Sequence, residues 1–343
     1  MQNTDKYTFI QTDEVLFAST RFVMKSFGDL EAGSKKIKEA CEGNICGDMI
    51  CVYRFGTVKE GRDVEVGFPV SKIVDAVDIT TRFLEPASVI STEFSGTIKD
   101  IGTTYSQIYK FASDGGFIVG EEFREVWQNF SKEDARLQVQ VPLHPWKSLF
   151  VSTASATLPP NQADELARDG AEITPFSNLE DRFNWARRAV EKLDKITEHK
   201  EKYEIISKCA HFYPPDLIAR AREAYRKRHE VDDVLEFIKT EGGWYPNCWR
   251  EGDKIYCEKK PQNPEAHRNA KTDHERRKAF CHCPVAKFDM DNMPDSFCLC
   301  GAGWMRQFWE GILGVPIQIN VCESVLSGGQ TCRFSFELET GHV

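Results

Sequence analysis

The chain has 343 residues, which fits two domains of ordinary size, and its 41% hydrophobic and 11% aromatic content is sufficient for buried cores. No segment approaches the ~18 apolar residues that a membrane span needs, and the first twenty residues lack the pattern of a secretory signal. A net charge of −9 argues against a nucleic-acid binder. We expect a cytoplasmic protein without membrane contact, in which twelve cysteines serve as thiols or metal ligands.

The first half of the chain contains an internal repeat. Residues 47–70 and 120–143 align without a gap at an offset of 73, so that Pro69 matches Pro142. Each copy ends in a stretch of alternating apolar and polar residues, which predicts a strand with one buried face. Each half is therefore expected to be strand–helix–strand–strand, duplicated about a pseudo-twofold axis in an antiparallel α+β domain. The expected strands and helices are 14–24, 32–41, 63–70, 89–98, 105–112 and 136–143.

The strand expected at 123–128 carries the most unusual pattern of this half. Phe123, Glu125 and Trp127 alternate and therefore share one face. An unpaired buried carboxylate is costly, so it could bind a cationic ligand, with cation–π attraction from the rings. Alternatively, desolvation raises its pKa and it acts as a general acid or base. A third interpretation is structural: Glu125 pairs with an arginine such as Arg54, or lies at a solvated edge.

The segment from about residue 7 to residue 146 resembles the GyrI-like effector-binding domain. The matching segments are GDMICVYR, DVEVGFPV, GFIVGEEFREVW and LQVQVPLHP. The resemblance implies that Glu125 reaches a hydrophobic cleft between the two halves, lined by aromatic side chains. The expected ligand-binding residues are Tyr53, Tyr105, Phe123, Glu125 and Trp127. Some members of the family hydrolyse electrophilic small molecules with a Glu and a Tyr, which makes Glu125, Tyr53 and Tyr105 candidate catalytic residues.

Two features depart from the family pattern. Matching Tyr53 with Trp127, and Cys51 with Glu125, requires a one-residue slip relative to the gapless alignment, which we interpret as a β-bulge. In addition, no DNA-binding segment precedes residue 7 in the sequence, so a transcription activator is not expected.

The second half is expected to be helical first and cysteine-rich afterwards. We interpret residues 149–177, with Pro159 and Pro160, as a linker. A helix is expected after Ser177, which has capping-box spacing with Glu180. Further along the chain the pattern favours helices at 216–229 and 231–240, a hairpin strand at 250–259 and a polar loop at 260–278. The basic run within 220–228 is expected to be a solvated helix face.

Two C-x-C pairs form the strongest local motif of the chain. Cys281 and Cys283 are followed, after 14 residues, by Cys298 and Cys300. In extended backbone, residues two apart project to the same side, so four thiolates could form a tetrahedral site for a structural zinc ion. Two alternatives remain open. The four thiolates could hold an iron–sulfur cluster, or they could be unligated or redox-active thiols.

The segment at 298–338 resembles the end of the 4-vinyl-reductase-like small-molecule-binding domain. The matching pieces are the cysteine and glycines before an amphipathic helix, LGVPI at its end, and SGGQTCRFSFEL leading into a last strand. The resemblance implies a hydrophobic ligand and a zinc site with ligands near Cys298 and Cys332. Val321 and Ser324 stand where the family has its other two ligands, and Cys281 and Cys283 could replace them.

The sequence thus predicts three parts: a GyrI-like domain at 1–148, the linker at 149–177 and a helical, cysteine-rich α+β domain at 178–343. The expected function is that of a stand-alone binding protein for a small hydrophobic or cationic molecule, as a sensor, sequestering protein or carrier. Two alternatives stay open. One is a hydrolase that uses Glu125 with a tyrosine, and the other is a thiol- or metal-handling protein.

A first prediction concerns DNA. Because the chain carries a net charge of −9, we expect no specific DNA binding in a gel-shift assay at physiological salt. Any weak phosphate contact should disappear as salt is added, whereas a complex with submicromolar affinity at physiological salt would contradict the prediction.

Overall fold

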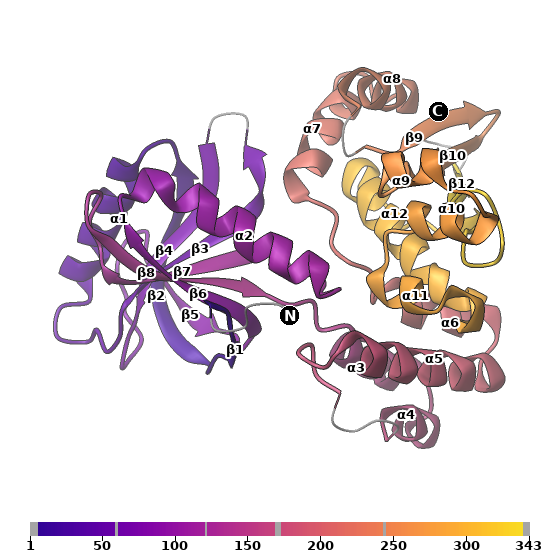
Figure 1. Ribbon diagram of the computed structural model, residues 1–343. Coiled ribbons are helices and arrows are strands. Elements are labelled where there is room, and N and C mark those ends of the chain that lie inside the picture. Colours follow the sequence, from indigo (N-terminus) through magenta and orange to yellow (C-terminus); the bar gives the residue numbers. More distant parts are fainter. Residues whose placement is uncertain (1–5, 59–60, 121, 169–172, 243–244, 339–343) are drawn as a thin grey trace. The chain divides into compact units, whose positions relative to one another are not determined.

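The structure is a computed structural model that describes residues 6–58, 61–120, 122–168, 173–242 and 245–338 (Figure 1). It divides into two compact units, Met1–His144 and Pro145–Val343. Among the described residues, no helix combines the length and apolar character needed to cross a membrane.

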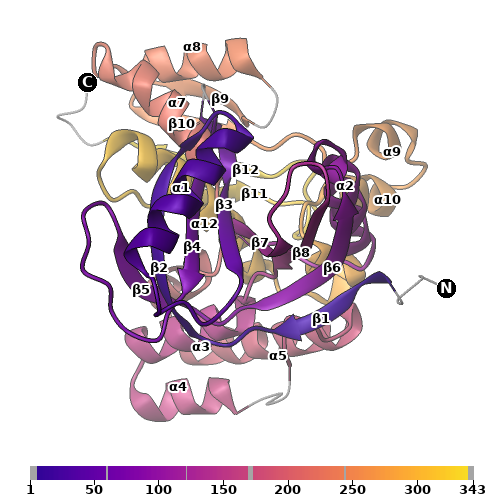
Figure 2. The same cartoon turned by 90° about the vertical axis from the view of Figure 1, so that its left-hand side faces the viewer.

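The first unit is one eight-stranded antiparallel sheet with the strand order β1-β6-β8-β7-β3-β4-β2-β5. Figures 1 and 2 show its two helices on the same side of the sheet, with α1 over β2 and β4 and α2 over β6. The predicted α+β class and the duplicated strand–helix–strand–strand unit are confirmed, as β2-α1-β3-β4 and β6-α2-β7-β8. The elements are β1 Thr8–Gln11, β2 Val15–Met24, α1 Phe27–Ala40, β3 Met49–Val58, β4 Gly61–Pro69, β5 Thr80–Leu84, β6 Ser88–Gly96, α2 Ile101–Asp114, β7 Glu122–Asn129 and β8 Ala135–Pro142.

The two copies meet where β3 pairs with β7 at the centre of the sheet. Cys51 lies directly opposite Glu125 in this pair. The two residues are 125 − 51 = 74 positions apart, whereas Val66 and Val139, on the strands β4 and β8 that flank the central pair, differ by 73. The predicted one-residue slip is therefore real, and irregular register in the two hairpins accounts for it.

The slip arises from hairpins of unequal length. Between Tyr53 and Thr57, β3 advances by four residues while β4 advances by two, from Val64 to Arg62. In the second copy, β7 advances by two residues from Trp127 while β8 advances by one. The first hairpin thus has one more unpaired residue than the second, as expected for a bulge.

Both helices of this unit begin several residues before the expected positions 32 and 105. In α1 the start is fixed by a capping box, in which the backbone N–H groups of Lys25 and Ser26 both donate to Asp29 Oδ2 at 2.7 Å. The helix α2 continues directly from a short 3₁₀ turn at Ile98–Asp100, which lengthens it at its N-terminus.

The second unit is built around α12, whose side chains Met305, Phe308 and Trp309 are fully buried. Gly303 allows a close crossing with α6, since a Cβ at this position would lie 1.8 Å from the Ser207 carbonyl oxygen. The unit also has a four-stranded antiparallel sheet with the order β11-β12-β10-β9. Its elements are α3 Trp146–Thr157, α4 Pro160–Ala167, α5 Leu179–Ile196, α6 His199–Ser207, α7 Pro215–Arg226, α8 Val231–Glu241, β9 Asn247–Glu251, β10 Lys254–Glu258, α9 Pro264–Asn269, α10 Asp273–Phe280, α11 Pro284–Phe288, α12 Leu299–Leu313, β11 Asn320–Glu323 and β12 Arg333–Glu337.

Two segments that the sequence predicted to be irregular are helical. The expected linker at 149–177 contains most of α3 and all of α4, and Phe150 of α3 is fully buried. The expected loop at 260–278 contains α9 and most of α10. There Thr272 and Glu275 form a capping box that starts α10 despite its polar sequence.

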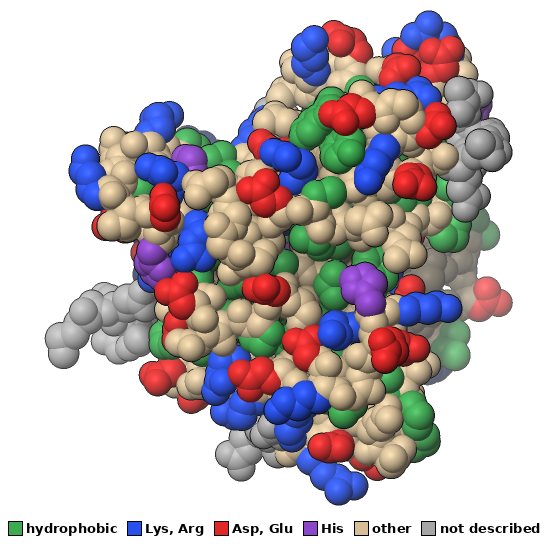
Figure 3. All heavy atoms as spheres, turned by 90° about the vertical axis from the view of Figure 1, so that its right-hand side faces the viewer, with side chains coloured by type: hydrophobic (Ala, Val, Ile, Leu, Met, Phe, Trp, Pro, Cys, Tyr) green, Lys and Arg blue, Asp and Glu red, His purple; other side chains and the backbone are tan. Residues whose placement is uncertain are grey.

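The helices α5, α7 and α8 of the second unit begin close to their expected positions. The cap of α5 is Asn178, one residue after the expected Ser177, and its side chain accepts from the Asp181 N–H at 2.8 Å. On α7 and just beyond it, Arg220 pairs with Glu241 and Arg228 with Asp233. On the face shown in Figure 3, basic and acidic side chains are interspersed. The basic run is thus partly neutralised by neighbouring acids.

Candidate functional site

The candidate site is the carboxylate of Glu125, on the face of the central β3–β7 pair that carries the helices. Three neutral donors bond to it: Tyr105 Oη at 2.6 Å, Tyr53 Oη at 2.9 Å and Trp127 Nε1 at 3.2 Å. Tyr53 comes from β3, Trp127 from β7 and Tyr105 from α2. The Glu125 side chain is buried, with 4% of its surface exposed. The structure therefore brings these four predicted site residues together around one carboxylate.

Aromatic rings enclose this group. Phe123 stacks on Tyr53, with centroids 4.9 Å apart, and meets Tyr105 edge-on at the same distance. On the other side of Glu125 along β7, Trp127 packs edge-on against Phe130. Phe27 at the start of α1 stacks on Phe130 and also contacts Trp127. All five predicted ligand-binding residues belong to this aromatic cluster, to which the structure adds Phe27 and Phe130.

Burial dominates the electrostatics of the cluster. It raises the pKa of Glu125, while the hydrogen bonds from Tyr105, Tyr53 and Trp127 and the charge of Arg62 oppose that rise. Burial and the neighbouring carboxylate also hold the pKa values of Tyr53 and Tyr105 well above the ordinary value. The phenols are therefore neutral hydrogen-bond donors at physiological pH.

Cys51 is a member of the site that the sequence analysis did not include. It is fully buried and lies directly opposite Glu125. Burial, together with the Glu125 charge, raises the pKa of its thiol well above the ordinary value, so it is not an activated nucleophile. Its place could have been inferred from the one-residue slip, which matches it with Glu125. No sequence motif indicated Phe27 or Phe130.

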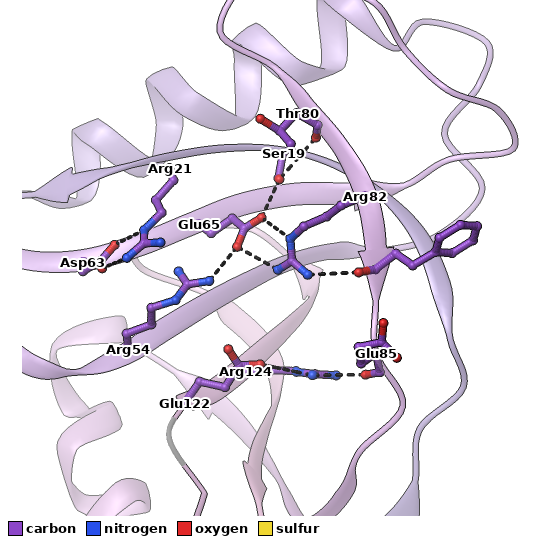
Figure 4. Close-up of polar contacts among 11 residues, drawn as sticks. Ser19, Arg21, Arg54, Asp63, Glu65, Thr80, Arg82, Glu85, Glu122 and Arg124 are labelled. Atoms are coloured by element: carbon purple, nitrogen blue, oxygen red, sulfur yellow. Dashed lines mark hydrogen bonds and ion pairs between the residues drawn. The ribbon is translucent and has the colours of Figure 1, made fainter. Parts of the chain in front are cut away.

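A second buried carboxylate, Glu65, lies on the opposite face of the sheet and differs in its partners (Figure 4). Arg82 donates to it at 2.8 and 2.9 Å, Arg54 at 2.9 Å and Ser19 Oγ at 2.6 Å. Burial raises the pKa of Glu65, but these hydrogen bonds outweigh it and lower the pKa to about 2. The structural interpretation in which Arg54 neutralises Glu125 is therefore wrong: strand alternation turns Arg54 toward Glu65.

The expectation of extended backbone holds for Cys281 and Cys283 but is wrong for Cys298 and Cys300. Cys281 and Cys283 cap the ends of α10 and α11, whereas Cys298 ends a 3₁₀ turn and Cys300 lies within α12. On a helix, residues two apart point in nearly opposite directions. Accordingly, the Cys300 thiol donates to the Cys209 carbonyl at 3.7 Å, while Cys298 Sγ accepts from Ser324 Oγ at 2.9 Å.

These side chains do not form a metal centre as they stand. Among the described residues, no group of three or more His, Cys, Asp or Glu side chains is placed to hold a metal ion. Burial raises the pKa of all four thiols. A four-thiolate zinc site thus stays a prediction from the sequence, and we derive no chemistry from it.

Part of the chain is similar in fold to solved structures. No protein-family model and no curated protein matches the chain. Among solved structures, 40% of the chain is similar to 96% of the EcmrR C-terminal domain, at 15% identity and a TM-score of 0.35, and to 57% of EcmrR in a complex with DNA. It is also similar to 93% of SAV2435 bound to tetraphenylphosphonium, at 9% identity and a TM-score of 0.31. A hydrolase from Listeria innocua matches over 91% of its length at 10% identity and a TM-score of 0.30.

Likenesses at these TM-scores do not establish a shared family. The GyrI-like and 4-vinyl-reductase-like resemblances therefore continue to rest on the sequence motifs. The expectation that the chain does not bind nucleic acid, which rests on its net charge of −9, stays a prediction.

The contrast between the two buried carboxylates predicts acid sensitivity at Glu65. Its folded-state pKa lies below the ordinary value of 4.5, so its stabilising effect is present above pH 4.5 and is lost as pH falls toward 2. We expect the free energy of unfolding of the first unit to fall by about 3 kcal/mol over this interval through Glu65. Urea titrations between pH 2 and 7 should show Glu65→Gln to be destabilised at neutral pH and less sensitive to acid.

The matched control for this experiment is Glu93→Gln on β6, since Glu93 is exposed and accepts a hydrogen bond from the neutral Gln138 side chain at 3.0 Å. It should retain the acid sensitivity of the unmodified chain. Parallel stability curves for Glu65→Gln and the unmodified protein would contradict the role assigned to Glu65.

The predicted zinc site can be tested by measuring the zinc content of the purified protein. Four thiolates in a closed shell require about one zinc ion per chain, which elemental analysis of protein purified without chelator would detect. Replacement of Cys298 by Ser should then lower both zinc content and thermal stability. Less than about 0.2 zinc per chain, with Cys281, Cys283, Cys298 and Cys300 open to alkylation, would contradict the prediction and leave the four as free thiols.

Proposed function

We propose that the first unit binds a small, largely apolar cation, with Glu125 as its counter-charge. The observation that carries this proposal is the set of partners of Glu125. Within the described part of the chain, the groups that bond to it are two phenols and an indole, not a basic side chain. Glu65, in the same sheet, is neutralised by two guanidinium groups. A buried carboxylate without a bonded cation favours one supplied by a ligand.

The surrounding rings match the same class of ligand. Tyr53, Phe123 and Tyr105 offer ring faces and edges next to the carboxylate, and a cation near such rings gains cation–π attraction in addition to the ion pair. The apolar part of the ligand would pack against the rings. A small inorganic cation would gain less from this environment, because most of the available partners are carbon atoms.

Access to Glu125 depends on Tyr105. The carboxylate is buried, and of the three donors Tyr105 alone comes from a helix and is partly exposed. Tyr53 and Trp127 are held in the sheet at 4% and 3% exposure. We infer that a ligand reaches Glu125 when the Tyr105 side chain turns aside, which replaces one neutral hydrogen bond by an ion pair.

Tetraphenylphosphonium, an aromatic cation, is a suitable probe. We expect Glu125→Gln to weaken its binding by at least about 1 kcal/mol, the scale of a lost charge-assisted contact, in isothermal titration calorimetry at neutral pH. Triphenylphosphine oxide, which is aromatic and neutral, should be affected less. Binding of the cation should also weaken as pH falls through the raised pKa of Glu125, whereas binding to Glu125→Gln should not follow this dependence.

Glu122→Gln is the matched control, because Glu122 lies on the same strand with its side chain on the opposite face, paired with Arg124. It removes the same charge and should leave binding of the cation unchanged. Equal losses for the cation and the neutral probe in Glu125→Gln, or no loss for either, would mean that Glu125 is structural.

A second candidate function is hydrolysis of a small electrophilic substrate. The specific observation in its favour is the 2.6 Å hydrogen bond from Tyr105 to a carboxylate whose pKa burial has raised, a pair suited to proton transfer. The two functions differ in turnover. A binding protein returns its ligand intact after long incubation, whereas a hydrolase releases product at a rate that Glu125→Gln should abolish.

A further inference from the structure

Two cysteines outside the C-x-C pairs lie side by side in the sheet of the second unit. Cys248 on β9 and Cys257 on β10 are directly opposite each other in an antiparallel pair. Their sulfur atoms are 2.6 Å apart. Because directly opposite residues project to the same face, no change of register is needed to bring the two thiols together.

The backbone geometry also suits a covalent bond between them. Opposite residues of antiparallel strands have Cα atoms about 4.5–5.5 Å apart, which lies inside the usual range of about 4.4–6.8 Å for a disulfide. Both cysteines are free thiols in the structure. We propose that Cys248 and Cys257 form a reversible dithiol–disulfide pair that responds to the thiol redox state of its surroundings.

The two thiols differ in accessibility, which sets the order of the reaction. Cys257 is buried at 2% exposure and its Sγ accepts from the Trp309 indole at 3.1 Å. Cys248 is only half-buried, on the edge strand of the sheet. The Cys248 thiolate therefore attacks a small-molecule disulfide such as oxidised glutathione, forming a mixed disulfide and releasing one thiol.

Cys257 completes the exchange. Its sulfur attacks Sγ of Cys248, the bond to the small molecule breaks, and a second thiol leaves. Two cysteine thiols and one small disulfide thus become one protein disulfide and two small thiols, with both protons carried away on the released thiols. Burial and the neighbouring Cys257 raise the pKa of Cys248, which lowers the thiolate fraction and slows the exchange.

The sequence allows a direct test by peptide mapping. Trypsin should release Cys248 in residues 240–250 and Cys257 in residues 255–259, and each peptide contains one cysteine. The full chain is equilibrated in glutathione buffers from fully reduced to fully oxidised, quenched with alkylating agent and digested. We expect the two peptides to be joined as the major species at the oxidised end and to separate again after reduction.

Cys248→Ser should abolish the joined species and leave the fold intact, because the position lies on an edge strand. Cys322→Ser is the matched control, on β11 of the same sheet with an exposed thiol, and it should keep the joined species. Oxidation should also raise the melting temperature of the second unit by about 2–5 °C, and Cys248→Ser should lack this shift. Recovery of both peptides unjoined at the oxidised end, alkylated or carrying glutathione, would overturn the proposal.

Discussion

The pairing of β3 with β7 is the interaction on which the first unit depends. It joins the two copies of the repeat, and it places Cys51 and Glu125 opposite each other at the centre of an eight-stranded sheet. Since the two copies contribute one strand each, a residue here lies at the boundary between the two halves. A functional group at this position therefore receives side chains from both halves, as Glu125 receives Tyr53 from one and Tyr105 from the other.

The same sheet shows how strand alternation separates two kinds of buried charge. Glu125 faces the helices among neutral aromatic donors, while Glu65 faces the other way toward Arg54 and Arg82. The consequence is opposite in sign: the pKa of Glu125 is raised, and that of Glu65 is lowered. Burial is common to both carboxylates, so the presence or absence of a bonded guanidinium group decides the direction of each shift.

The sequence was informative where a pattern repeats and weak where helices are short and polar. The repeat predicted the duplication, and alternation predicted the β-strands and placed Phe123, Glu125 and Trp127 on one face. Tyr53 and Tyr105 were named as site residues, and Cys51 was matched with Glu125, only through the resemblance to the GyrI-like domain. The sequence pattern did not reveal α9 and α10, because their capping residues stabilise helices that lack an apolar stripe. The C-x-C argument assumed extended backbone, which the helical start of α12 excludes for Cys298 and Cys300.

The twelve cysteines illustrate why spacing alone is a weak guide to thiol chemistry. The C-x-C pairs are the obvious motif, yet the helical turn at Cys300 directs its thiol to a backbone carbonyl. Cys248 and Cys257 are nine positions apart and form no motif, but a hairpin brings their sulfur atoms together. Cross-strand neighbours depend on hairpin register, which follows from the turn and from the burial of Ile255 and Cys257, the latter against Trp309 of α12. Proximity of this kind becomes visible only when the register of β9 and β10 is known.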